Sequence, residues 1–226
     1  MRPSPPFAIL CALLPEAAAV RAGLRRAGVG RGGVSIVGMG PLRAKRAAAR
    51  LASVLPDGLP VVVVGVGGAL VGGVVAGDLV VANALGTADG DGGELGVTRP
   101  PAPLPARSAA FSDQVAAALS ARYPSTRQAP VLSAGRTARG PERLVLGASG
   151  AVLCDTESYW LSRLAERRPF AVVRSVVDSP ERELVSLRTL TGGITALRRL
   201  SGVAEVLACL LERQLRPVPS EMKTVE

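Results

Sequence analysis

Short apolar runs alternate along this chain with segments of helical periodicity, and this alternation limits the folds open to it. The run from Pro60 to Gly65 is almost pure valine, which suits a strand buried on both faces of a sheet. Further runs with strand character lie at Phe7–Ala12, Val34–Gly38, Asp78–Leu85, Pro130–Ser133, Ala151–Cys154 and Phe170–Val177. Strands that alternate with helices predict βαβ units, and therefore an α/β domain.

Helical patterns fill the intervals, at Glu16–Ala27, Leu42–Leu55, Ser108–Tyr123, Asp155–Glu166 and Ile194–Arg213. In the last of these, one face carries Ile194, Leu197, Leu200, Ala204, Leu207 and Leu211. The segment Gly86–Arg107 is rich in Gly, Asp and Pro and has no period, so we predict a flexible loop there. Residues 217–226 are expected to form a frayed tail, and 1–226 a single domain.

The composition restricts both the core and the kinds of active site that this chain can form. Apolar residues make up 48% of the chain and aromatics only 3%, so the core must be built from aliphatic side chains. The chain has no His, which excludes a His-ligated metal site and a Ser/His/Asp triad. Cys11, Cys154 and Cys209 lack CxxC spacing and lie in apolar runs, which indicates buried thiols in a reducing, cytoplasmic compartment.

The net charge of +9 raises the question of nucleic-acid binding. The positive residues are nearly all Arg, are spread along the chain and are not interleaved with stacking aromatics, so no nucleic-acid partner is expected. An anionic substrate or membrane surface fits this charge better, and basic RNA binding is kept as an alternative that predicts steep salt dependence.

The start of the chain resembles a short signal peptide, because Arg2 precedes an apolar stretch from Phe7 to Leu14. Pro3, Pro5 and Pro6 interrupt the pattern and Glu16 ends it early, so we expect a first buried strand, with bacterial secretion as the alternative. The stretch is too short to span a bilayer.

Two glycine-rich segments and several acids are candidates for a site. Gly38-Met39-Gly40 is placed between a strand and a helix, where backbone N–H groups can hold an anion, and Gly65-Val66-Gly67-Gly68 is expected as a turn after the Val run. Neither completes a dinucleotide-binding fingerprint, which leaves a dinucleotide-dependent oxidoreductase as a minor alternative. Glu16, Asp155, Glu157 and Asp178 follow predicted strands, where ligands of α/β sheets bind.

Singly, these acids have ordinary explanations: a helix N-cap for Asp155, a first-turn dipole partner for Glu157 and a turn-starter for Asp178. Their joint spacing is more specific. Val152-Leu153-Cys154-Asp155-Thr156-Glu157-Ser158 followed by Pro169-Phe170-Ala171-Val172-Val173-Arg174-Ser175-Val176-Val177-Asp178 resembles the purine nucleoside phosphorylase superfamily, whose members usually read V-D-M-E-(S/A) and then P-F-x-x-V-R-x-(I/V)-(S/A)-D. The segment from Gly65 to Asp78 also resembles this superfamily. The opening segment, Phe7 to Glu16, resembles the methylthioadenosine/adenosylhomocysteine nucleosidases.

The resemblance implies a single-domain, three-layer α/β sandwich with a mixed, largely parallel sheet flanked by helices, and cleavage of a purine nucleoside at its N-glycosidic bond. In it, Asp178 would donate a proton to the base, Arg174 would orient Asp178, and Glu16 would activate water. Glu157, with Asp155 and Thr156 beside it, would bind the ribose. Gly38, Gly40, Gly65, Val66, Gly67 and Gly68 would line the pocket. No cofactor is implied beyond phosphate as a possible co-substrate, and a homo-oligomer is expected.

Three departures from the family pattern weaken parts of this hypothesis. Thr156 stands at a Met position that packs on ribose, Val66 stands at a hydroxyl position, and Gly135-Arg136-Thr137-Ala138-Arg139 lacks the base-stacking aromatic, for which an Arg could substitute. A degenerate member that binds a nucleoside without cleaving it is therefore the main alternative.

Within the superfamily, the hopanoid-associated (adenosylhopane) phosphorylases are the most similar branch, through Val177-Asp178-Ser179-Pro180-Glu181 and the segment Thr191–Leu197. A lipid-linked nucleoside would imply peripheral association with a membrane.

Overall fold

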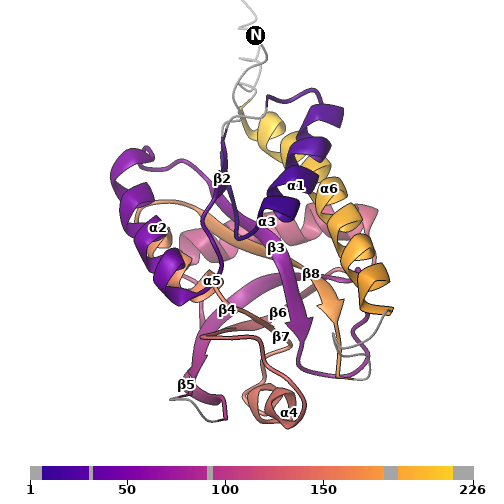
Figure 1. Cartoon of the computed structure of the whole chain (residues 1–226). Coiled ribbons are helices and arrows are strands. Elements are labelled where there is room, and N and C mark those ends of the chain that lie inside the picture. Colours follow the sequence, from indigo (N-terminus) through magenta and orange to yellow (C-terminus); the bar gives the residue numbers. More distant parts are fainter. Residues whose placement is uncertain (1–6, 31–32, 91–93, 181–187, 216–226) are drawn as a thin grey trace, which may run out of the picture.

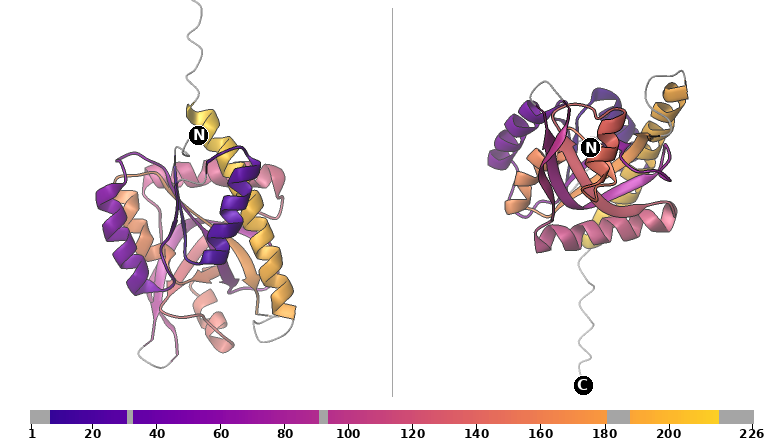
Figure 2. Two further views of the ribbon diagram at one scale, coloured as in Figure 1. Left: turned by 45° about the horizontal axis from the view of Figure 1, so that its top comes forward. Right: turned by 90° about the horizontal axis from the view of Figure 1, so that it is seen from below.

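The computed structural model describes residues 7–30, 33–90, 94–180 and 188–215, the last with side chains at 192–210. A central eight-stranded sheet is flanked by helices on both faces, as Figures 1 and 2 show. The strands are β1 Ala8–Cys11, β2 Val34–Ile36, β3 Val61–Ala69, β4 Leu79–Asp89, β5 Gly96–Pro103, β6 Arg127–Ala134, β7 Leu153–Asp155 and β8 Phe170–Asp178. The helices are α1 Leu14–Arg26, α2 Pro41–Val54, α3 Ala106–Arg122, α4 Pro141–Gly147, α5 Ser158–Leu161, the 3₁₀ helix η1 Ser162–Glu166 and α6 Arg188–Leu215.

The sheet is mixed. Its order is β2-β1-β3-β7-β6-β4-β5, and β8 pairs with both β3 and β4. Strands β3, β8, β4, β6 and β7 therefore pair in a closed cycle, in which β7 runs antiparallel to β3 and β8 antiparallel to β4. The predicted α/β sandwich with a mixed sheet is confirmed.

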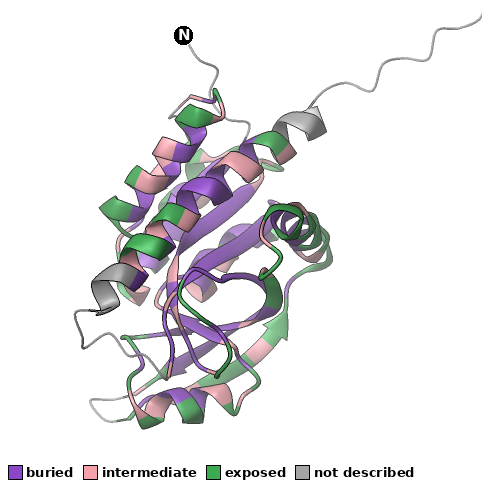
Figure 3. Ribbon diagram, turned by 90° about the vertical axis from the view of Figure 1, so that its right-hand side faces the viewer, coloured by how far each residue is buried: buried purple, intermediate pink, exposed green. Residues whose placement is uncertain are grey.

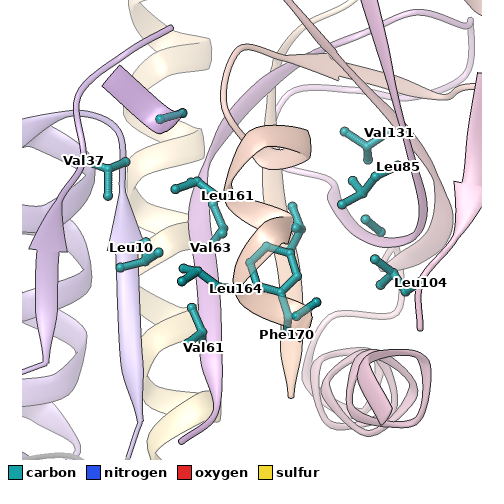
Figure 4. Close-up of a cluster of buried hydrophobic side chains, with 14 of the residues drawn as sticks. Leu10, Val37, Val61, Val63, Leu85, Leu104, Val131, Leu161, Leu164 and Phe170 are labelled. Carbon is teal, nitrogen blue, oxygen red and sulfur yellow. The ribbon is translucent and has the colours of Figure 1, made fainter. Parts of the chain in front are cut away.

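Alternation along the Val run explains why the sheet is buried on both faces. Val62 and Val64 enter the core under α1, α3 and α6, whereas Val61 and Val63 enter the opposite core under α2, α5 and η1. Figure 4 shows part of the second core, with Val61 and Val63 beside Leu161 and Leu164. Successive strand side chains point to opposite faces, so an uninterrupted aliphatic run is what two cores require. In Figure 3 the buried residues of α1 and α6 face the strands.

The predicted loop at 86–107 was wrong. β4 continues to Asp89, and β5 pairs with it as an antiparallel edge strand. Pro100, Pro101 and Pro103 hid this strand from pattern analysis, because proline lacks the N–H that a ladder needs. An edge strand tolerates that loss, since one of its sides has no neighbour.

Other boundaries shifted. Gly65–Gly68 do not form a turn but belong to β3, the predicted helix at 155–166 begins only at Ser158, and α4 was not predicted. On α6, Leu200, Ala204 and Leu207 are buried and Leu197 partly so, but Ile194 is half exposed. The side chain of Leu211 and the predicted tail at 217–226 lie outside the described residues.

Cys11 and Cys154 are buried as expected, whereas Cys209 is exposed on α6. The first apolar run forms the buried strand β1, which lies between β2 and β3 in the sheet. Across the described ranges, no helix has the length and apolar character needed to cross a membrane.

A buried arginine fixes the end of α2. Arg168 is almost fully buried, and its Nε donates to the carbonyl of Pro56 at 3.1 Å while its Nη2 donates to the carbonyls of Ala52 at 3.2 Å and Leu55. These carbonyls lie at the helix C-terminus, where intrahelical donors are lacking. Arg168 therefore joins α2 to the start of β8.

We predict that Arg168→Met lowers the free energy of unfolding by about 2–4 kcal/mol, because several charge-assisted hydrogen bonds are lost together. Urea unfolding measures it. The matched control is Arg167→Met, whose side chain is 66% exposed and makes one long contact with Asp57, and a change within about 0.5 kcal/mol is expected. Equal losses in the two variants would contradict the anchoring role of Arg168.

Candidate active site

A pocket opens where β3, β7 and β8 end beside the start of α1. The structure brings most of the predicted site residues together around it. Those that line it are Glu16, Val66, Gly67, Gly68, Asp155, Thr156, Glu157 and Asp178. Met39, Thr137, Ala138 and Arg143 are among the other lining residues. Three carboxylates that are far apart in sequence, at 16, 157 and 178, thus share one cavity.

Glu16 is held in place by backbone donors. Its Oε2 accepts a hydrogen bond from the N–H of Leu13 at 2.9 Å, and its Oε1 accepts one from the N–H of Val66 at 2.8 Å. The first contact closes the N-terminus of α1, and the second ties that helix to β3. The carboxylate is thereby fixed at the pocket wall, and a carboxylate retains acceptor capacity for a further donor such as water.

Asp155 organises the turn that presents Glu157. Its Oδ1 accepts hydrogen bonds from Ser133 Oγ at 2.6 Å and from the N–H groups of Glu157 at 3.0 Å and Ser158 at 3.1 Å. Its Oδ2 accepts from Arg174 Nε at 2.8 Å and from the Ser158 hydroxyl. With so many internal donors, Asp155 positions its neighbours. It ends β7 and the N-cap residue of α5 is Glu157, so the N-cap explanation for Asp155 was wrong.

Arg174 lies fully buried beneath the pocket floor. Besides Asp155 it contacts Glu157 Oε2 at 3.3 Å and Ser158 Oγ at 2.9 Å through Nη2. Burial by itself lowers the pKa of Arg174, but the carboxylates of Asp155, Glu157 and Glu16 outweigh it and raise that pKa above its usual value. For Glu157, an acid, burial has the opposite effect and raises the pKa, and the positive charge of Arg174 opposes this shift. One cation thus compensates a group of buried acids.

The predicted partner of Asp178 was wrong. Arg174 binds Asp155 and Glu157, and residues four apart on a strand such as β8 are not brought together as they would be on a helix. Asp178 forms its ion pair with Arg143, from α4, and both side chains are buried. Asp178 was expected to have apolar surroundings, but the guanidinium of Arg143 lies beside it.

The glycines serve mainly to admit other groups. A Cβ at Gly65 would overlap with Arg174 Nη1 and stand 2.7 Å from Glu16 Oε1, and one at Gly68 would stand 2.7 Å from Asp178 Oδ1. Gly65 therefore lies behind the acids and does not line the pocket. Gly38 also lies away from it and adopts φ +82°, beside Arg43.

One backbone group of the turn expected to hold an anion, the N–H of Gly40, is already engaged, and so is the N–H of Val66. The N–H of Gly40 donates to Glu157 Oε1 at 3.0 Å, and that of Val66 donates to Glu16. Gly40 lines a neighbouring recess with Arg136 and Arg139. Thr156 lines the pocket and its hydroxyl bonds Glu157 Oε1. Gly40 thus supports a carboxylate of the protein itself.

In the segment where the resemblance implied a base-stacking aromatic, Thr137 and Ala138 line this pocket. Arg136 is exposed and paired with Glu142, whose pKa its hydrogen bonds lower to about 2, so it is held away from a stacking role. Burial raises the pKa of the pocket residue Cys154 to about 12, which keeps its thiol protonated at neutral pH and unsuited to nucleophilic attack.

Sequence analysis missed Arg143. It lies on a helix of seven residues in a segment without an apolar period, and nothing local distinguishes it from the other arginines. Ser133 and Ser158 were missed for a related reason, since a serine that bonds a buried carboxylate carries no pattern of its own.

Solved structures match this chain across its length. A 5′-methylthioadenosine/S-adenosylhomocysteine nucleosidase from Helicobacter pylori matches with a TM-score of 0.69 at 17% identity, covering 92% of this chain and 97% of the other. The fold is that of these nucleosidases. Futalosine hydrolase of Helicobacter pylori matches at 0.68 with 18% identity (92% and 97% covered), and a nucleosidase from Colwellia psychrerythraea, in complex with adenine, at 0.68 with 21% (93% and 97%). No protein-family model and no curated protein matches the sequence.

We predict that Gly65→Ala destabilises the protein by about 1–3 kcal/mol, because its methyl group displaces Arg174 or Glu16 from a packed cluster. Thermal unfolding measures it. Gly96→Ala is the control, since among the described residues no atom stands within 4 Å of its added Cβ. A Gly65→Ala protein as stable as the control would contradict the prediction, because it would show that the cluster accommodates the methyl group without loss of stability.

Proposed function

We propose that this protein cleaves the N-glycosidic bond of a purine nucleoside, with water as the nucleophile. The observation that carries the proposal is the gathering of Glu16, Glu157 and Asp178 around one pocket at the strand ends. Its fold, shared with nucleosidases, supplies the second line of support.

Each acid is set for a different task. Cleavage builds positive charge on the sugar, and a buried carboxylate at Glu157 stabilises that charge while accepting hydrogen bonds from ribose hydroxyls. Glu16, fixed by two backbone donors, is placed to take a proton from an attacking water. Asp178 lines the same pocket, and we assign it to assisting the departure of the base.

Water is favoured over phosphate by the donors already in use. The N–H groups of Gly40 and Val66, which could help to bind phosphate, serve the carboxylates of Glu157 and Glu16, and the pocket cation Arg143 is paired with Asp178. Val66 adds an apolar side chain where a hydroxyl would help to hold phosphate. Phosphorolysis is the outcome that the experiment below must exclude.

An adenine nucleoside is the proposed substrate, in line with the adenine bound to the Colwellia psychrerythraea nucleosidase. A lipid-linked form such as adenosylhopane is a finer proposal. It draws support from Leu13 and Met39, which line the pocket and are 39% and 55% exposed, and from the net charge of +9. Membrane association and a homo-oligomer stay predictions with it.

The test is to incubate the protein with adenosine, methylthioadenosine and adenosylhomocysteine, with and without phosphate, and to quantify adenine, free sugar and sugar phosphate by chromatography. Hydrolysis gives adenine and free sugar at a rate independent of phosphate. Formation of sugar 1-phosphate would show that phosphate, and not water, is the nucleophile. Thermal stabilisation by these nucleosides without any adenine released would identify a binding protein and refute the enzyme.

We predict that Glu16→Gln lowers the hydrolytic kcat by about 10²–10⁴-fold, because an amide cannot take the proton from water. Steady-state rates of adenine release measure it. Glu166→Gln, at an exposed position at the end of η1, is the control with unchanged rate. If phosphate supports a reaction in the wild type, that reaction should survive Glu16→Gln, and equal damage to both would contradict water activation.

We predict that Asp178→Asn lowers the rate of base release by about 10²-fold or more while the fold persists, because Asn retains the shape but not the charge of the pocket carboxyl. Near-ultraviolet circular dichroism verifies folding. Asp113→Asn, at an exposed position on α3, serves as its control. Full activity in Asp178→Asn would remove Asp178 from the mechanism.

A further inference from the structure

Arg143 projects a buried positive charge into the wall of the pocket. Its Nη1 donates to the carbonyl of Ala69 at 2.7 Å, and its Nη2 pairs with Asp178 Oδ2. The side chains of the pair are 3% and 1% exposed. Arg143 is thereby held at two points, by the end of β3 and by the end of β8, and it cannot swing into solvent without leaving Asp178 buried.

Arg143 differs from Arg174, the other cation of the site, in its position and in its partners. Arg174 lies below the pocket and serves Asp155 and Glu157. Among the described residues that line the pocket, Arg143 alone carries a positive charge. A guanidinium keeps its positive charge in proteins and can donate several hydrogen bonds in its plane.

This arrangement bears on how the base departs. When the bond from the sugar to the base breaks, its electron pair moves onto the base, which becomes a poor leaving group unless it gains a proton or a cationic partner. Asp178 Oδ2 is already engaged by the guanidinium of Arg143. The pocket still offers a cation beside it.

We propose that Arg143 is a catalytic residue that stabilises the departing purine by hydrogen bonding to it, with Asp178 holding the guanidinium in place. The inference rests on the proposed function. The C1′–N bond breaks and its electron pair stays on the base. Water adds to C1′ and gives its proton to Glu16, and the base takes up a proton from solvent after release while Glu16 returns its own to solvent.

The experiment compares two substrates: adenosine (or whichever adenine nucleoside proves best) and p-nitrophenyl riboside, whose leaving group departs without assistance. Arg143→Met should lower kcat/KM for the nucleoside by about 10²–10³-fold and leave p-nitrophenyl riboside largely unchanged. Arg143→Lys, which retains a positive charge, should fall between wild type and Arg143→Met on the nucleoside. Arg46→Met, at an exposed position on α2, is the matched control.

Arg143→Met leaves Asp178 without its cation, so the double variant with Asp178→Asn guards against misfolding by removing both charges. It should be no slower on the nucleoside than Arg143→Met alone, because Asp178 acts through Arg143. A further large loss would instead make Asp178 an independent proton donor and overturn the proposal. Equal losses on both substrates, or no loss, would also overturn it.

The proposed function fails separately. A wild-type protein that cleaves neither substrate refutes glycosidic cleavage itself, whereas a wild type that cleaves both and is indifferent to Arg143→Met refutes only the role of Arg143.

Discussion

The buried guanidinium of Arg174 is the interaction on which the site depends. Removing a charge from water is costly, and the cost is offset only where several well-placed partners surround it. Asp155, Glu157 and Ser158 provide those partners, and Gly65 leaves the room for them. The same contacts fix the turn after β7, so the protein cannot keep its core without also presenting Glu157 to the pocket.

The acids of the pocket differ because their surroundings differ. Glu16 is held by backbone N–H groups, Glu157 by backbone, hydroxyl and guanidinium donors, and Asp178 by Arg143. Carboxylates that share a cavity but not an environment can take different parts in one reaction. The closed cycle of strands brings them together, since β3, β7 and β8 are neighbours in it.

Several parts of this structure could be predicted from the sequence, and for identifiable reasons. The Val run predicted a doubly buried strand, because burial on both faces removes the polar alternation that a half-exposed strand would show. The position of Glu16, Asp155, Glu157 and Asp178 after predicted strands predicted a shared crevice, and the cavity that they line confirms it for three separate segments. β5 was missed because its prolines contradict strand propensity, which an edge position tolerates. The resemblance paired Arg174 with Asp178, whereas the structure pairs it with Asp155 and Glu157.

The sequence by itself determined the layered α/β architecture, the aliphatic core and the exclusion of histidine chemistry, because these follow from composition and local periodicity. Only the tertiary structure decided which cation serves which acid. Arg143 and Asp178 lie on separate elements, and their contact exists only once α4 packs beside the end of β3. Ion pairs of this kind are set by the three-dimensional path of the chain, and a buried charge that finds its partner across such a distance leaves no periodic signal behind.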